Sequence, residues 1–193
     1  MKTYRVTLES ATPYSQSKYH ETPKLDKEQA DDYDRRTVLE HLHYDPVTEE
    51  VFIPPMAIQN CLADTAKFLG MQIPGRGKST YTKHFLAGLM LFEPIYLGVK
   101  KSDVKVDANF LNTDGVRGSG KRAIRRFPRI DSWKATFNIL VADETITATV
   151  LRKHLEQAGL LVGIGRFRPR NGGFYGRFNL VGFEEVQMAE AAE

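Results

Sequence analysis

The stretch of this chain richest in ligand-binding residue types is Gly163-Ile164-Gly165-Arg166-Phe167-Arg168-Pro169-Arg170-Asn171-Gly172-Gly173-Phe174-Tyr175-Gly176-Arg177-Phe178. Glycine adopts positive φ and lets the backbone approach an anion closely. Arginine presents a planar fork of donors that matches phosphate, and aromatic rings stack on unpaired bases. A flexible surface loop with solvated arginines is the alternative. The interleaving of all three types favours a nucleic-acid-binding loop, whose predicted contacts are Arg166, Phe167, Arg168, Arg170, Phe174, Tyr175 and Arg177.

The net charge of +3 conceals an uneven distribution along the chain. Residues 76–177 carry 19 Lys and Arg against 8 Asp and Glu, a local balance of +11. Residues 20–50 carry ten acidic residues against four basic ones. This asymmetry predicts a polyanion-binding face and a separate acidic segment. Ordinary solvated charge is the alternative.

The overall composition is that of a globular domain. The chain has 193 residues, 41% hydrophobic and 26% charged, which is enough for one domain with a sizeable core. No window approaches the ~18 uncharged apolar residues of a membrane span, and no signal-peptide pattern opens the sequence. The single cysteine, Cys61, excludes an intrachain disulfide and fits a core position. A cytoplasmic protein is expected.

Hydrophobic periodicity predicts the order of the elements. Strands are predicted over residues 2–9, 51–53, 87–92, 95–99, 104–110, 133–141 and 178–186. The pair 87–92 and 95–99 is typical of short strands or of a hairpin. Helices are predicted over residues 56–69, ended by Gly70, and 143–158, ended by Gly159.

Two excursions interrupt this order. Residues 10–50 form an insertion with a short charged helix over 24–36. Residues 107–131 form a basic, thumb-like excursion, expected to be mobile. Without the excursions the order is β-α-β-β-α-β, which predicts an α+β, ferredoxin-like (RRM-like) fold in a single domain over residues 1–193.

Two further basic segments are predicted to contact a nucleic-acid backbone. Residues 73–80 fail the phosphate-loop pattern, which needs glycine where Gln72 stands. We interpret Arg76, Lys78, Lys83 and His84 as a basic loop that contacts a nucleic-acid backbone, with predicted contacts at Arg76, Lys78 and Lys83. Within the thumb-like excursion the predicted contacts are Arg117, Lys121, Arg122, Arg125, Arg126 and Arg129, and so many phosphate contacts would make binding steeply salt-dependent.

Two segments resemble the RAMP superfamily, the repeat-associated proteins of CRISPR ribonucleoproteins. Residues 51–62, Val-Phe-Ile-Pro-Pro-Met-Ala-Ile-Gln-Asn-Cys-Leu, are similar to its "I-P-G-S-S-x-K-G" segment, although Pro55 and Met56 replace the glycine and serine. Residues 155–178 resemble its closing helix and its "G-x-G-x-x-R-x-x-G-[FY]-G-R" loop. Residues 11–20, the Ile-Pro-Pro-Met segment over residues 53–56, and residues 81–85 also resemble small phage and prophage proteins.

The resemblance implies a ferredoxin-like palm, a protruding thumb, and polymerisation along a single-stranded guide RNA. Residues 107–131 would be the thumb, and Arg166, Arg168 and Arg170 would lie beside the strand. The chain is short for that group, so a solitary phage relative that coats RNA or single-stranded DNA also fits. In a head-to-tail filament, the acidic insertion or thumb of one copy would meet the palm of the next.

The enzyme alternative is a metal-independent endoribonuclease, an activity that the resemblance also implies. His20 or His84, each beside a lysine and a tyrosine, would then move protons. His41 and His43 lack the further ligands of a metal site, so no metal and no cofactor is expected. A phage structural protein without nucleic-acid binding is a third class. The choice between RNA and DNA stays open.

Overall fold

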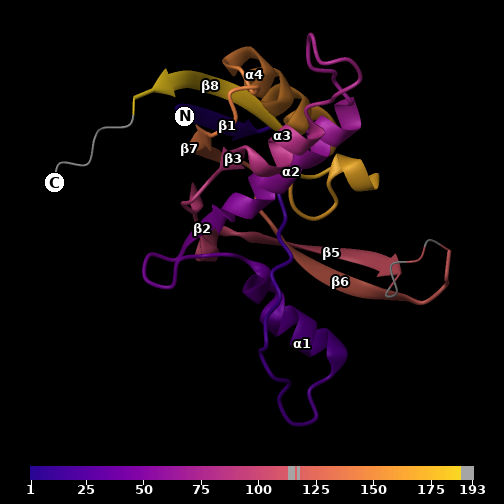
Figure 1. Cartoon of the computed structure of the whole chain (residues 1–193). Coiled ribbons are helices and arrows are strands. Elements are labelled where there is room, and N and C mark those ends of the chain that lie inside the picture. Colours follow the sequence, from indigo (N-terminus) through magenta and orange to yellow (C-terminus); the bar gives the residue numbers. More distant parts are fainter. Residues whose placement is uncertain (113–115, 117, 188–193) are drawn as a thin grey trace.

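The computed structural model describes residues 1–112, 116 and 118–187. It has two parts (Figure 1): a sheet covered by helices, and a protruding part that carries the insertion and a long hairpin. Of the helices in these residues, none has the length and apolar character that a bilayer crossing requires.

An antiparallel four-stranded sheet forms the first part. Its strands are β1 (Lys2–Ser10), β3 (Leu89–Met90), β7 (Lys134–Val141) and β8 (Phe178–Val186). The spatial order is β3-β7-β1-β8, and Val6 at the centre pairs with Phe137 on one side and Phe183 on the other. Alternate residues of β1, Tyr4, Val6 and Leu8, are buried, as the period-two pattern requires.

Helices cover the face of the sheet that holds Val6. They are α2 (Pro55–Leu69), α3 (Thr82–Ala87) and α4 (Ala148–Gln157). Proline at the first position of α2 gives up an amide that would have no partner, and Gly70, at φ 55°, ends the helix. The Thr147 side chain caps α4 by accepting a hydrogen bond from the Val150 amide.

Taken along the chain, β1, α2, β3, β7, α4 and β8 form the β-α-β-β-α-β arrangement. The mixed helix and strand content, the antiparallel pairing and the central position of β1 confirm the predicted ferredoxin-like fold.

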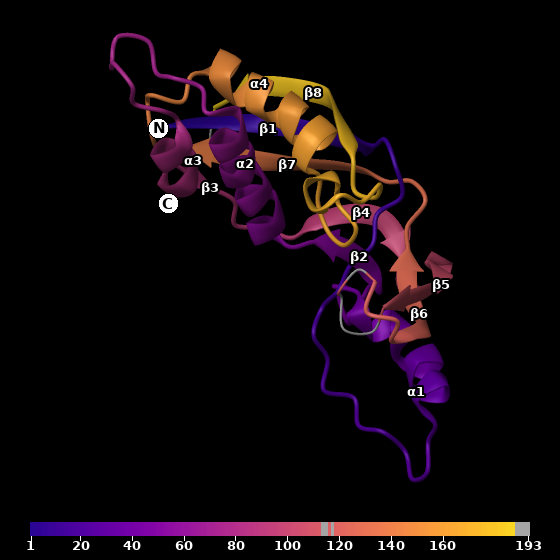
Figure 2. The same ribbon diagram turned by 90° about the vertical axis from the view of Figure 1, so that its right-hand side faces the viewer.

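The protruding part contains two small sheets and one short helix. Strands β2 (Glu50–Ile53) and β4 (Ile95–Lys100) pair with each other, as do β5 (Lys105–Asn112) and β6 (Arg122–Arg129). Helix α1 (Ala30–Thr37) and the 3-10 turn η1 (Val38–His41) lie against β6. Figures 1 and 2 show that α1 and the β5–β6 hairpin project from the same end of the molecule.

Two details of the predicted local structure were wrong. Residues 87–92 and 95–99 contain short strands, one of the two predicted alternatives, but they do not form a hairpin, because β3 pairs with β7 while β4 pairs with β2. Gly159 does not end the last helix: the chain continues as a π-helical turn, η3 (Ala158–Val162), and Gly163, at φ 68°, ends it. A Cβ at Gly159 would overlap the Phe178 carbonyl oxygen, so glycine is needed there for close packing.

The expected separation of the acidic and basic segments is also corrected. The basic excursion contains β6, and α1 of the acidic insertion packs against that strand within the same chain. The Arg126 guanidinium lies 2.6 Å from the Asp31 carboxylate and 3.4 Å from that of Asp34. The two segments therefore neutralise each other locally.

Candidate nucleic-acid interface

The glycine-rich loop over residues 163–177 is a docked structure, held by backbone hydrogen bonds. The Ile164 amide donates to the Gly176 carbonyl at 3.0 Å, and the Gly176 amide donates to Pro13 at 2.7 Å. The Arg166 amide donates to the Ser15 carbonyl at 2.9 Å. The loop is thus fixed against the chain that leaves β1, and its side chains are held in place.

Glycine is required at two crossings of this loop. Gly176 has φ 76°, and a Cβ there would overlap the Ile164 carbonyl oxygen. A Cβ at Gly173 would overlap the Phe167 carbonyl oxygen. These glycines allow two backbone segments to lie in contact, rather than supplying flexibility.

Two rings hold the Arg166 side chain in place. Its guanidinium lies 4.3 Å from the centre of the Phe127 ring in β6 and 5.9 Å from that of Phe167. The two rings are themselves in edge-to-face contact, with centres 5.0 Å apart. Burial lowers the pKa of Arg166, and the nearby Asp34 carboxylate opposes that change. Arg166 forms no ion pair with any other described residue.

A cavity of about 440 Å³ opens beside Arg166. It lies between the loop, the hairpin and η1. Its lining combines arginines, rings and hydrogen-bonding groups, namely Asp34, His41, Leu111, Asn112, Arg125, Arg126, Phe127, Arg166 and Phe167. The lining thus holds three guanidinium groups and one carboxylate, but Arg125 and Arg126 are already paired with carboxylates of α1, which leaves Arg166 as the lining arginine without an ion pair among the described residues.

The hairpin and the loop are joined at a second point. The Tyr175 hydroxyl donates a hydrogen bond to the Asp107 carboxylate in β5, and Asp107 also pairs with Arg129 at 3.2 Å. Burial raises the pKa of Tyr175, and the contact with Asp107 adds to the effect. Tyr175 and Arg129 therefore fix the base of the hairpin in the free protein.

Other predicted loop contacts point elsewhere. Arg168 and Arg170 lie 3.5 and 3.8 Å from the Asp64 carboxylate of α2. Arg177 donates to the carbonyl oxygen of Leu160. Phe174 is 64% exposed.

The remaining predicted basic contacts form two groups. Arg122, stacked on the Phe110 ring at 4.6 Å, and Lys121 lie at the far end of the hairpin, and Arg117 lies outside the described residues. The exposed residues Arg76, Lys78 and Lys83 lie in or beside the loop that connects α2 to α3. That loop is at the opposite end of the molecule from the hairpin (Figure 2). The two groups of basic residues are therefore far apart on the described part of the chain.

The two histidines considered for catalysis, His20 and His84, have different neighbours and do not contact each other. The Nδ1 atom of His84 lies 2.5 Å from the Asp143 carboxylate, whose pKa is lowered, because its hydrogen bonds with His84 and Thr145 outweigh its burial. His20, in the insertion, lies instead against His41, with ring centres 4.7 Å apart. Among the described residues, no group of three or more metal-ligating side chains comes together.

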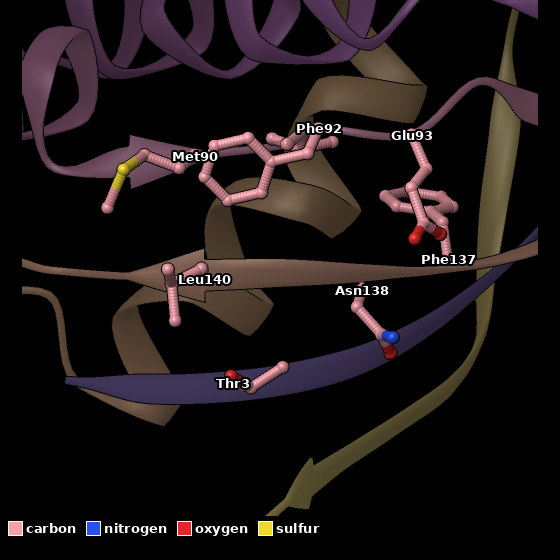
Figure 3. Close-up of a pocket in the computed structure, with 8 residues that line it drawn as sticks. Thr3, Met90, Phe92, Glu93, Phe137, Asn138 and Leu140 are labelled. Atoms are coloured by element: carbon pink, nitrogen blue, oxygen red, sulfur yellow. The ribbon is translucent and has the colours of Figure 1, made fainter. Parts of the chain in front are cut away.

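The open face of the four-stranded sheet has a different character. Arg5 pairs with Glu184 at 3.2 Å and Thr7 bonds Thr136 at 2.9 Å, so the central strands present polar groups rather than stacking rings. A cavity of about 180 Å³ lies at the β3 edge (Figure 3). Its lining, which includes Met90, Phe92 and Glu93, holds no arginine or lysine, and so does not suit a polyanion.

Sequence reasoning missed several lining residues of the cavity beside Arg166. His41, Asp34 and Phe127 come from three segments that only the fold brings together. Phe127 had a visible signal, because it is an aromatic residue in a run of arginines. Asp34 and His41 had none, because their segment was assigned to a separate acidic insertion.

Comparison with solved structures supports the predicted fold. A chain in the cryo-EM structure of the type III-B Cmr-beta bound to cognate target RNA is similar, with a TM-score of 0.56 and 14% identity. The match covers 96% of the present chain and 61% of the other, so this chain spans about three fifths of that length. At this identity the likeness concerns the fold alone.

A second similar structure is the crystal structure of a CRISPR protein from Archaeoglobus fulgidus. Its TM-score is 0.41 at 14% identity, and the match covers 97% of this chain and 65% of that chain. No inference is drawn from a TM-score at this level. No protein-family model matches the sequence, and no curated protein matches it.

The backbone crossing at Gly176 leads to a stability prediction. Gly172→Ala and Gly176→Ala both place a side chain at φ near 75°, which costs about 1–2 kcal/mol. At Gly172 the added Cβ meets no atom within 4 Å, whereas at Gly176 it overlaps the Ile164 carbonyl. We expect the Gly176 variant to lose clearly more free energy of unfolding in urea titrations. Equal losses would show that the loop is not docked as described.

Proposed function

We propose that this protein binds single-stranded RNA in the cavity between the glycine-rich loop and the β5–β6 hairpin. The main observation behind this proposal is the environment of Arg166. Its guanidinium is partly buried, is stacked on Phe127, and borders a cavity that two further arginines line. Among the described residues Arg166 has no ion pair, and its guanidinium is partly removed from water, so an anionic ligand would stabilise its charge. A phosphate group matches the planar set of donors that a guanidinium presents.

The choice of single strands over duplex rests on the rings. Phe167 borders the cavity, and Phe174 is exposed nearby in the sequence of the same loop. Such rings stack on any unpaired base, so the proposed binding is largely independent of sequence. RNA is favoured over DNA because the similar Cmr-beta structure is bound to target RNA. Binding within a CRISPR-type ribonucleoprotein and coating of a strand by a solitary phage protein both use this same site.

Arg166→Ala tests the site. We expect single-strand affinity to fall about 10- to 100-fold, since a charge-assisted hydrogen bond is worth about 1.5–3 kcal/mol. Arg152→Ala is the matched control: it removes the same charge from an exposed position on α4 and should change affinity less than about twofold. Fluorescence anisotropy with oligouridine, oligoadenosine, the DNA equivalents and a duplex provides the measurement.

Three results would count against the proposed site. If Arg166→Ala and Arg152→Ala lost the same affinity for single strands, the binding would depend only on overall positive charge and not on this site. Tighter binding to the duplex would rule out base stacking. No binding to any of these at low salt would favour a phage structural protein.

The second candidate function is metal-independent RNA cleavage. The observation in its favour is the His84–Asp143 contact, since a carboxylate that orients an imidazole is common in acid–base catalysis. His20 belongs to a different segment and contacts His41 instead. We propose binding without cleavage, because His84 is not among the residues that line the cavity beside Arg166, where the strand is proposed to bind.

Labelled RNA incubated with the protein in EDTA is therefore expected to stay intact. A denaturing gel after several hours at neutral pH is the measurement, with His84→Ala and His20→Ala run in parallel. Cleavage by the wild type that either substitution abolishes would establish the endoribonuclease alternative.

We further propose that copies assemble head to tail along the strand through the hairpin. Phe110 and Ile124 are directly paired across β5 and β6, and they are 55% and 51% exposed. A paired apolar patch on a protruding hairpin suits contact with the palm of a neighbouring copy. Such a contact does not close on itself and would produce a filament.

The double variant Phe110→Ser with Ile124→Ser is expected to lose long assemblies on a long single strand while still binding short oligonucleotides. The control, Leu25→Ser with Val47→Ser, removes two exposed apolar side chains from the insertion and should assemble normally. Light scattering and negative-stain microscopy follow assembly. Normal filaments from the hairpin variant, or a monomeric wild type on a saturated strand, would contradict the assembly proposal.

A further inference from the structure

Two carboxylates of α1, those of Asp31 in its first turn and of Asp34 in the next, lie against arginines of the hairpin. The Arg126 Nη1 atom lies 2.6 Å from Asp31 Oδ1, and its Nη2 atom lies 3.3 Å from Asp31 Oδ2, so the guanidinium holds this carboxylate with both arms. The Arg126 backbone amide donates to Asp34 at 2.9 Å, and Arg125 lies 3.8 Å from the same carboxylate.

This set of donors is the kind that proteins use for a nucleic-acid backbone. A guanidinium group forms paired hydrogen bonds with a phosphate in the same way as with a carboxylate, and backbone amides donate further hydrogen bonds to phosphate oxygens. The carboxylates of Asp31 and Asp34 are three residues apart in one helix, and therefore lie on one side of it. Together they place two neighbouring negative charges against the hairpin.

The covered arginines border the cavity beside Arg166. Arg125, Arg126 and Asp34 line that cavity, and the Asp34 charge acts on Arg166 as well. A strand bound at Arg166 therefore comes directly to the edge of α1. Its next phosphates compete with the α1 carboxylates for the same donors.

The attachment of α1 depends on charge more than on apolar packing. Thr37, in its last turn, is the one buried residue among the eight of the helix. The hydrogen bond from Arg126 lowers the pKa of Asp31, which keeps this carboxylate ionised. Contacts of this type weaken when another anion offers the arginines the same charge.

We propose that the hairpin surface under α1, formed by Arg125 and Arg126, is a phosphate subsite, and that Asp31 and Asp34 occupy it in the free protein. Two consecutive phosphates of a bound strand replace these carboxylates, and α1 leaves the hairpin. This inference rests on the proposed function, because it extends the strand that Arg166 binds.

The double variant Asp31→Asn with Asp34→Asn tests the subsite. It removes the competing charges, so affinity for oligouridine should rise about tenfold, the factor that corresponds to about one charge-assisted contact. The control, Asp26→Asn with Asp32→Asn, makes the same change in net charge at two exposed positions of the insertion. An equal rise in the affinity of both variants would show that only the net charge matters. A fall in the affinity of the Asp31/Asp34 variant would show that the two carboxylates stabilise the site and do not compete with the strand.

Hydrogen exchange on the wild-type protein gives a second test that needs no substitution. Amides of residues 30–37 should exchange faster when the protein is saturated with oligouridine, while those of residues 163–177 become more protected. Unchanged or slower exchange in α1 overturns the displacement while leaving binding at Arg166 intact. If Arg166→Ala has no effect on binding, the proposed function itself fails, and the displacement fails with it.

Discussion

The contact between the glycine-rich loop and the chain leaving β1 is the constraint on which the rest of this structure depends. The Gly176 amide bonds Pro13 and the Arg166 amide bonds Ser15, so the loop is attached to the first strand of the sheet. From this attachment Arg166 reaches the Phe127 ring, and Tyr175 reaches Asp107. The loop thereby joins the palm-like sheet to the protruding hairpin and sets the position of the cavity between them.

This arrangement divides the basic residues by role. Arg168 pairs with Asp64 of α2 and holds the loop in place, whereas Arg129 pairs with Asp107 and fixes the base of the hairpin. Arg166 is stacked on rings at the mouth of the cavity. Basic composition alone does not reveal this division, because ion pairs that fix a framework and arginines that bind a ligand have the same sequence signature.

Much of the palm could be predicted because its signals are local. Alternation in β1 and β7, and the apolar stripe of α2 ended by Gly70, each follow from residues adjacent in sequence. The glycine-rich loop was found for the same reason. The pairing of β3 with β7 was not, since a two-residue strand carries no periodicity and its partner lies far along the chain. The contact of α1 with Arg126 joins residues 95 positions apart, and charge counts suggested that these segments would separate.

The central claim is that a single strand lies between the loop and the hairpin. Ultraviolet crosslinking to a uridine oligonucleotide, followed by mass spectrometry of the attached peptides, tests it most directly. We predict crosslinks at Phe167 and Phe127, the two rings in contact at the cavity. Crosslinks confined to the open face of β1 and β7, or to the loop that carries Arg76 and Lys78, would contradict the account.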